Sequence, residues 1–249
     1  MLDVKDLSVG YGERTVLRDV TFSLPVGSFT AIVGPNGCGK STLLKTVLGI
    51  LPIKAGSVTF DGTSISAFKR GALARHVSYL AQSRSVPDMT VSEAVLHGRF
   101  PYLSYPRRYR ECDRQAACAA MERVGILPYA DTPLSRLSGG ERQNVFVAMT
   151  LAQGTDVLLF DEPTASLDAR HAYALFKTLK ALASEGKTVA VVTHDLPLAF
   201  SLADRVAVFA EKGLLCFDTP ERVLASASVE KAFGVSLARS DEAGYYYRY

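Results

Sequence analysis

A glycine-rich loop with one lysine and one serine is the first segment of the chain suited to chemistry. Its sequence is Gly34-Pro35-Asn36-Gly37-Cys38-Gly39-Lys40-Ser41. Glycines let backbone N–H groups turn towards phosphate oxygens, while Lys40 can reach the β- and γ-phosphates and the Ser41 hydroxyl can ligate Mg²⁺. Thr42 adds a further donor. The loop therefore predicts a nucleotide site, against the alternative of an accidental glycine turn.

Two adjacent carboxylates, Asp161 and Glu162, follow the apolar run 157–160. A carboxylate at the open end of a buried strand can help to hold Mg²⁺, and its neighbour can orient a water for attack on phosphorus. A helix N-cap after a strand is the alternative explanation. Beside a phosphate loop, the pair favours phosphoryl transfer to water.

A serine and two glycines form a second candidate anion site. Ser138-Gly139-Gly140 precede the segment 141–153, which has the pattern of a helix. A serine hydroxyl and glycine amides at a helix N-terminus attract negative charge.

A parallel sheet is the element that could bring these residues together. The segments 29–33, 157–160 and 188–192 are apolar runs of the length of buried strands. A helix beginning near Lys40 follows the first run, and the helical pattern 169–184 joins the other two. This alternation of strand and helix predicts parallel β-α-β units.

The remaining segments have other patterns. Residues 2–60 are rich in Val, Thr and Phe between Gly and Pro turns, which predicts short strands. Residues 85–152 have a helical pattern, including a helix over 111–124 that ends at Gly125. The end of the chain, 229–249, predicts a small helical or irregular appendage.

In this order, the phosphate loop, the serine-glycine turn and the acidic strand end resemble the ATPase subunits of ATP-binding-cassette (ABC) transporters, over about 2–235. The resemblance implies an α/β P-loop NTPase with a mostly parallel core sheet, an N-terminal antiparallel β subdomain and an inserted α-helical lobe at about 85–152. Residues 1–235 would form a single ABC ATPase domain and 236–249 a C-terminal tail. ATP and Mg²⁺ would be bound, and ATP would be hydrolysed to ADP and phosphate.

Several single residues acquire roles by the same resemblance. Tyr11 matches the aromatic residue that stacks on adenine, and Gln82 the glutamine that contacts Mg²⁺ and the attacking water. His194 matches the switch histidine that contacts the γ-phosphate. Taken alone, each of these residues has a commoner structural explanation.

Two segments match parts that act on the other copy of a dimer. The segment that binds the partner's ATP is Leu137, Ser138, Gly139, Gly140 and Glu141, and the loop that crosses between subunits is Ser166, Leu167 and Asp168. One chain therefore holds halves of two different sites. Two copies stacked head-to-tail with two-fold symmetry would complete both sites.

The transported substrate is predicted from finer resemblance. The segment 91–102, with Gly98-Arg99-Phe100-Pro101, looks like that of ATPases that import iron chelates (siderophores or haem) and cobalamin, as does His194–Ala199. His171 matches a histidine frequent in those proteins, whereas Ala172 departs from their pattern. Zinc or manganese importers are the alternative. Non-transport members are disfavoured, because the chain has one cassette and no long coiled coil.

The implied partners are a second copy of the chain, two copies of a transmembrane permease subunit and, indirectly, an extracytoplasmic substrate-binding protein. The ATPase would lie peripherally at the cytoplasmic face of the inner membrane. No apolar run approaches the roughly 20 residues of a membrane span, and Met1–Asp6 lacks the form of a signal peptide.

Composition adds two expectations. The net charge of +3 is small and predicts no nucleic-acid partner. The four cysteines lack metal-ligand spacing, which favours a reduced compartment, and Cys38 is expected to be a small packing residue.

A cluster of basic and aromatic residues is open to two interpretations, a solvated loop or a contact with the permease or anionic lipid: Arg99, Arg107, Arg108, Arg110, Tyr102, Tyr105 and Tyr109.

Overall fold

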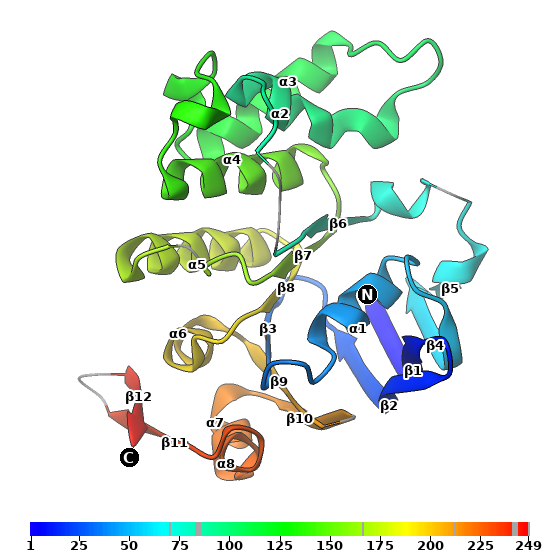
Figure 1. Ribbon diagram of the computed structural model, residues 1–249, viewed down its shortest axis with the longest axis vertical. Helices are drawn as coiled ribbons and strands as arrows, with labels where there is room; N and C mark the ends of the chain where they lie inside the picture. Colours follow the sequence, from blue (N-terminus) through cyan, green and yellow to red (C-terminus); the bar gives the residue numbers. More distant parts are fainter. Residues whose placement is uncertain (70, 83–85, 166, 212, 241–243, 249) are drawn as a thin grey trace.

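A computed structural model describes residues 1–69, 71–82, 86–165, 167–211, 213–240 and 244–248. A mostly parallel sheet lies at the centre of the molecule, with a helical lobe at one end and an antiparallel sheet at one side (Figure 1). None of the described helices has the length and apolar character that a bilayer crossing requires.

The central sheet has the strand order β10-β9-β3-β8-β7-β6, and only β10 runs antiparallel to its neighbour. Its strands are β3 (Phe29–Val33), β6 (Val77–Leu80), β7 (Val157–Asp161), β8 (Thr188–Val192), β9 (Arg205–Ala210) and β10 (Gly213–Asp218). Every residue of β3, β7 and β8 is buried, because both faces of the sheet are covered. The strands predicted from the three apolar runs are confirmed.

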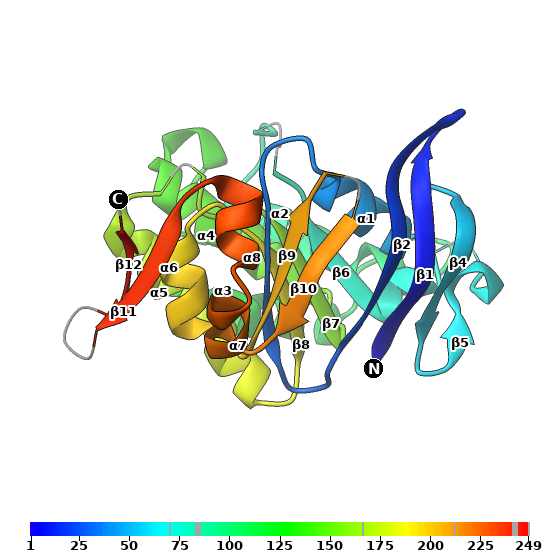
Figure 2. The ribbon, with the colours of Figure 1, turned by 90° about the horizontal axis from the view of Figure 1, so that it is seen from below.

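Helices cover one face of this sheet, and a helix with the antiparallel sheet covers the other (Figure 2). The helices outside the lobe are α1 (Lys40–Val47), α5 (Ala169–Ser184), α6 (Leu196–Leu202), α7 (Pro220–Ala225) and α8 (Ser228–Phe233). Phe29 of β3 meets Phe176 of α5 with ring centroids 5.5 Å apart. The predicted helix over 169–184 is confirmed with the same bounds.

The antiparallel sheet has the order β2-β1-β4-β5 and consists of β1 (Leu2–Tyr11), β2 (Arg14–Leu24), β4 (Ile53–Phe60) and β5 (Thr63–Ser64). β1 and β2 are longer than the predicted short strands. Bulges let them continue past irregular positions, with register shifts between Val4 and Leu7 and between Leu7 and Val9. Their apolar side chains pack with α1 against the central sheet.

The helical lobe consists of α2 (Val91–Leu96), η3 (His97–Tyr102), α3 (Glu111–Arg123), η4 (Leu127–Tyr129), η5 (Leu134–Arg136) and α4 (Gly139–Ala152). It has its own apolar core, which includes Val95, Met121 and Val145. The helix predicted over 111–124 is confirmed to within one residue, and Gly125 follows it with a φ of 72°. The predicted fold class is therefore confirmed.

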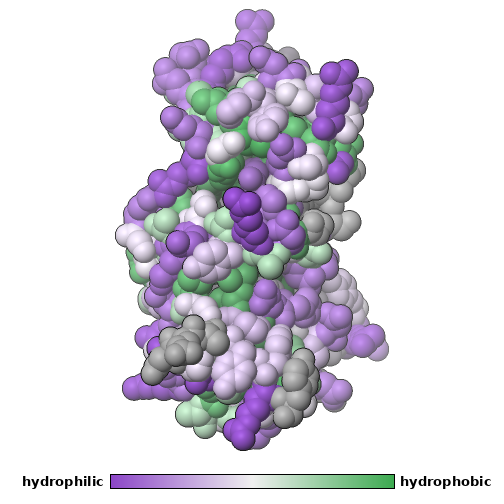
Figure 3. All heavy atoms as spheres, turned by 90° about the vertical axis from the view of Figure 1, so that its left-hand side faces the viewer, coloured by the Kyte–Doolittle hydropathy of each residue, from purple (hydrophilic) through white to green (hydrophobic). Residues whose placement is uncertain are grey.

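The C-terminal segment differs from its prediction. After α8, the strands β11 (Ser236–Ser240) and β12 (Gly244–Arg248) pair as an antiparallel hairpin. Tyr245 is buried against Phe200 of α6, with ring centroids 5.5 Å apart. This long-range contact gives the segment an apolar partner, which its own sequence does not reveal. On the face drawn in Figure 3, hydrophilic side chains cover most of the surface and apolar ones show between them in small areas.

The fold also includes η1 (Ile65–Ala67) and η2 (Leu73–Arg75), two short turns between β5 and β6. η2 connects the core to the lobe, because Arg75 Nε donates a hydrogen bond to the Pro101 carbonyl at 2.9 Å. Gln153, just after α4, donates from its Nε2 to the Ala74 carbonyl at 2.5 Å. These bonds fix the C-terminal end of α4, whereas Ser138 lies at its N-terminal end.

Candidate active site

The residues predicted to act on a nucleotide converge at the carboxyl edge of the parallel sheet. The phosphate loop follows β3, Gln82 follows β6, Glu162 follows β7 and His194 follows β8. Parallel neighbours end at the same edge, so loops far apart in sequence meet there. A cleft of about 650 Å³ is lined by residues from three of these loops, including Lys40, Gln82 and Glu162.

The phosphate loop has the local structure that its glycines predict. Gly39 has a φ of 106°, and a Cβ there would lie 2.8 Å from Leu17 and 2.9 Å from Val16. α1 begins immediately afterwards at Lys40, so its N-terminal amides face the loop. The buried Lys40 ammonium donates hydrogen bonds to the carbonyls of Gly34 at 2.7 Å and Pro35 at 2.9 Å.

Cys38 is a packing residue of this loop. Burial raises the pKa of its thiol, although the nearby Lys40 ammonium opposes the shift. The neutral thiol is a weak nucleophile, which agrees with the predicted packing role and not with a redox switch.

Glu162 is held between Gln82, which lines the cleft with it, and His194. Its carboxylate accepts a hydrogen bond from Gln82 Nε2 at 2.6 Å and lies 2.8 Å from His194 Nε2. The backbone of Glu162 has a φ of 49°, a region that non-glycine residues seldom adopt, and its N–H donates to the Val192 carbonyl. The turn after β7 therefore aims this carboxylate into the cleft with fixed partners on both sides.

Asp161 lies one residue earlier, at the end of β7, and is buried. Its Oδ2 accepts a hydrogen bond from the Tyr79 hydroxyl at 3.1 Å. Its Oδ1 is buried with no hydrogen-bond partner among the described residues. A buried carboxylate oxygen without a partner is costly, unless a cation or a water completes it.

The cleft also contains residues that the motifs did not single out. Arg14 and Val16 line it beside Tyr11, whose side chain is half exposed. Tyr11 and Arg14 are paired across the turn between β1 and β2, which places both on one rim. The signal available in the sequence was this turn at Gly12-Glu13, because it returns the chain beside Tyr11.

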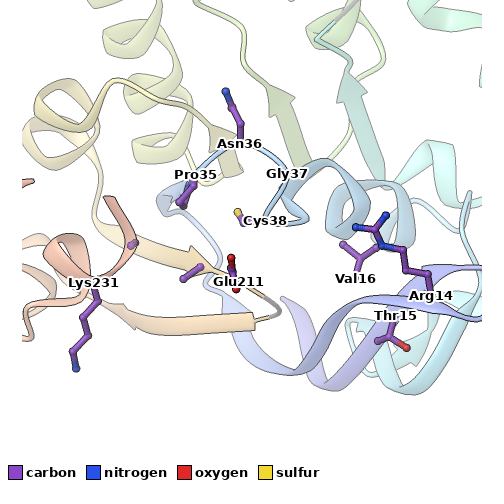
Figure 4. A pocket seen from close by; sticks show the side chains of 11 residues that line it. Arg14, Thr15, Val16, Pro35, Asn36, Gly37, Cys38, Glu211 and Lys231 are labelled. Atoms are coloured by element: carbon purple, nitrogen blue, oxygen red, sulfur yellow. The ribbon is translucent and has the colours of Figure 1, made fainter. Parts of the chain in front are cut away.

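A second cavity, of about 770 Å³, opens on the other side of the phosphate loop, between the loop, the end of β9 and α8 (Figure 4). Cys38 turns its sulfur towards this space, whereas Lys231 extends away from the loop. Glu211 is an exposed carboxylate on its rim. This cavity contains neither Gln82 nor Glu162 among its described lining residues, so the cleft on the first side is the candidate active site.

The serine-glycine turn lies at the start of α4, away from that cleft. Ser138 is the N-cap, its Oγ accepts from the Glu141 N–H at 3.3 Å, and the Glu141 carboxylate accepts from the Ser138 N–H at 2.8 Å. The Ser138 hydroxyl donates to the same carboxylate at 2.7 Å. These two bonds from Ser138 hold the pKa of Glu141 below its ordinary value. Leu137 is buried in the core of the lobe.

The predicted inter-subunit loop is described in part. Ser166 lies outside the described residues. Asp168 is the N-cap of α5 and accepts a hydrogen bond from the His171 N–H at 2.8 Å. Among the described residues that line the cleft, none comes from 137–141 or from 167–168. The structure therefore brings the phosphate loop, Gln82 and Glu162 together in one cleft. The two segments matched to the other copy do not line this cleft.

Arg99 differs from the rest of the basic cluster, because it is nearly buried. Its Nε donates to the buried Asp113 carboxylate at 3.1 Å and its Nη1 donates to the Ala152 carbonyl at 2.9 Å. Its guanidinium carbon lies 4.0 Å from the centroid of the Tyr102 ring. The solvated-loop interpretation is wrong for Arg99, which joins three elements of the lobe.

Comparison with known proteins agrees with this geometry. The protein-family model described as ABC transporter matches residues 17–165. The ferric enterobactin transport ATP-binding protein FepC of Escherichia coli (strain K12) is 39% identical over 96% of this chain and 89% of its own length. The iron(3+)-hydroxamate import ATP-binding protein FhuC of Bacillus subtilis (strain 168) is 42% identical over 78% of this chain and 73% of its own length.

A manganese transport ATP-binding protein of Bacillus subtilis (strain 168), MntB, is 34% identical over 95% of this chain and 93% of its own length. Among solved structures, a metal-chelate type ABC transporter in an inward-facing conformation matches with a TM-score of 0.85 and 26% identity, covering 100% of this chain and 97% of the other. The motifs, the fold and these likenesses agree: the chain belongs to the ABC transporter ATPase family and is an ATP-binding subunit that couples ATP hydrolysis to transport.

Proposed function

We propose that Glu162 orients and polarises the water that attacks the γ-phosphate of ATP. The observation that carries the proposal is the fixed carboxylate between Gln82 and His194, in the same cleft as Lys40. Phosphoryl transfer needs positioning and charge neutralisation more than covalent chemistry, so one carboxylate beside the water suffices. His194 fixes Glu162 from the second side and can reach the γ-phosphate edge of the cleft.

The other side chains of the cleft bind the nucleotide. Loop amides and the Lys40 ammonium neutralise the phosphates, and Thr42 supplies a further hydroxyl. Tyr11, on the rim, presents a half-exposed ring on which adenine can stack. Lys40 must release the loop carbonyls that it now contacts in order to bond phosphate oxygens.

The donor set fits Mg²⁺. Asp161 Oδ1 is a buried oxygen without a partner among the described residues, at the strand end directly before Glu162. Ser41, Gln82 and Glu162 line the cleft. Within the part of the chain that the structure describes, no group of three or more His, Cys, Asp or Glu side chains could form a metal cage. This agrees with Mg²⁺, which is commonly held by one or two carboxylates, waters and substrate phosphates. When bound, Mg²⁺ would neutralise charge on the β- and γ-phosphates.

A second copy of the chain is proposed to complete each ATP site. The turn Ser138–Gly140 has amides and a hydroxyl at the start of α4 but does not line the cleft of its own chain. In a head-to-tail pair, this turn would face the γ-phosphate held by the partner's phosphate loop, and the loop 167–168 would cross nearby.

The proposed cargo is an iron chelate, a siderophore complex or haem, or else cobalamin. Support comes from the relatives named for ferric enterobactin and iron(3+)-hydroxamate and from the segment around Gly98. A Cβ at Gly98 would lie 2.2 Å from the Met149 carbonyl oxygen, so this segment packs tightly on α4. The resemblance of this segment to the chelate importers is therefore evidence of relatedness within the family and not of contact with the cargo. The manganese relative keeps a zinc or manganese importer as the second candidate.

The ATPase would act at the cytoplasmic face of the membrane, beneath two permease subunits supplied by an extracytoplasmic binding protein. An apolar groove of about 310 Å³ at the junction of core and lobe, lined by Ile50, Leu73 and Gln153, offers a contact for the permease. Ile50 is largely exposed there.

Uptake in cells tests the cargo. Deleting the gene should abolish uptake of radiolabelled ferric siderophore, haem or cobalamin, and wild-type protein, but not a Glu162→Gln variant, should restore it. Manganese and zinc uptake should be unchanged. Loss of manganese or zinc uptake with normal uptake of the chelates would refute the chelate proposal and favour the alternative.

A further inference from the structure

His171 occupies an unusual place, between the two segments that are proposed to meet the partner copy. Its Nδ1 lies 2.8 Å from Asp168 Oδ1, in the loop before α5. The other edge of its ring lies over Gly140, in the first turn of α4: a Cβ at Gly140 would be 3.6 Å from Cδ2 and 3.8 Å from Nε2 of His171. One imidazole is therefore bonded to Asp168 on one edge and lies beside the glycine turn on the other, within a single chain.

The bond to Asp168 is not needed to start α5. The His171 backbone N–H already donates to Asp168 Oδ1 at 2.8 Å and provides the N-cap bond. The buried face of α5 consists of other side chains, including Leu175, Phe176 and Leu179, while His171 is exposed. Removing the imidazole leaves the helix cap and the core intact.

The electrostatics of the contact favour an ionised Asp168. The His171 N–H and then its ring nitrogen hold the pKa of Asp168 below its ordinary value. The carboxylate is thus a fixed acceptor, and the imidazole presents N–H to it through Nδ1. This tautomer leaves Nε2 facing the glycine turn.

We propose that His171 is a positioning residue that fixes the loop at Leu167–Asp168 against the turn Ser138–Gly140, so that both present one rigid surface to the partner copy. The inference rests on the proposed head-to-tail assembly. Without the imidazole, the two segments move independently, and closing the dimer must order both of them. His171 contacts neither the chain's own phosphate loop nor the cleft, so ATP binding by a single copy does not depend on it.

The test uses ATP-dependent association of the full chain in a Glu162→Gln background, measured by analytical ultracentrifugation. Adding His171→Ala should weaken association about three- to tenfold, as expected for loss of one hydrogen bond to a charged group at an exposed position. His171→Asn keeps a donor to Asp168 at the position of Nδ1 but lacks the ring edge beside Gly140, so it should be nearly as weak as His171→Ala. Lys177→Ala, which removes an exposed cation from the same helix, is the matched control and should have no effect.

In an otherwise wild-type chain, His171→Ala should lower kcat while leaving the Kd of dilute monomer for ATP unchanged. Equal association of the Ala variant and its parent would overturn the inference, as would an Asn variant that associates as tightly as the parent. A lower melting temperature or weaker ATP binding by the Ala monomer would assign His171 to folding instead. If the Glu162→Gln variant itself did not form a dimer in the presence of ATP, the proposed assembly would be refuted, and this inference with it.

Discussion

Replacing Glu162 by glutamine should nearly abolish ATP turnover while preserving the shape of the cleft. The carboxylate accepts from Gln82 Nε2 at 2.6 Å and lies 2.8 Å from His194 Nε2. Glutamine keeps the size but loses the negative charge, and its NH₂ group replaces one of the two acceptor oxygens. Positioned acid–base groups contribute about 10²- to 10⁴-fold in rate, equivalent to about 3–5 kcal/mol of transition-state free energy.

Phosphate release at saturating ATP measures kcat. We expect kcat to fall at least about 100-fold, while the Kd for ATP, set by the phosphate loop and Tyr11, changes little. Glu211→Gln is the matched control, because Glu211 lines the second cavity across the loop, and it should leave kcat unchanged. A Glu162→Gln variant with wild-type turnover would refute the role assigned to this carboxylate.

Two further outcomes follow from the lobe. Glu141→Gln removes a negative charge from the turn that would meet the partner's phosphate, while its amide oxygen can still accept a hydrogen bond from Ser138. ATP-dependent association, measured by ultracentrifugation, should therefore tighten about two- to fivefold. Weaker association would count against an anion site at this turn. Asp113→Asn should lower the melting temperature at neutral pH by about 5 °C, because it weakens a buried pair with Arg99. Burial alone would raise the pKa of Asp113, but bonds from the Arg110 N–H and from Arg99 hold it below the ordinary value. Its contribution to stability is thus complete above about pH 4 and is lost as the pH falls through the folded pKa; an equally steep acid melting curve for Asp113→Asn would contradict this.

The sequence was sufficient where local patterns determine structure. The buried strands β3 and β8 and the helix α5 have the predicted bounds, because an apolar run covered on both faces and a helix between Asp168 and Ser184 need little information from elsewhere. The glycine loop likewise has the backbone that its glycines allow, with Gly39 at a φ of 106°.

Contacts between distant segments could not be predicted. The hairpin β11–β12 depends on Tyr245 meeting Phe200 of α6, and the burial of Arg99 depends on Asp113 and on the carbonyls at the end of α4. In the site, Gln82 and His194 were matched one by one to a family. That both of them contact the Glu162 carboxylate follows only from the adjacent, parallel strands β6, β7 and β8.

Mixing two defective variants tests most directly whether ATP sites are shared between copies. Both variants are made in a Glu162→Gln background. Lys40→Ala should no longer bind ATP, whereas Ser138→Arg should bind ATP but block the serine-glycine turn. Neither variant should therefore form a dimer with itself. Their mixture should form heterodimers with about one ATP each, because the phosphate loop of one copy then faces the intact turn of the other. Association of the Ser138→Arg variant alone, as tight as that of its parent, would contradict the shared site.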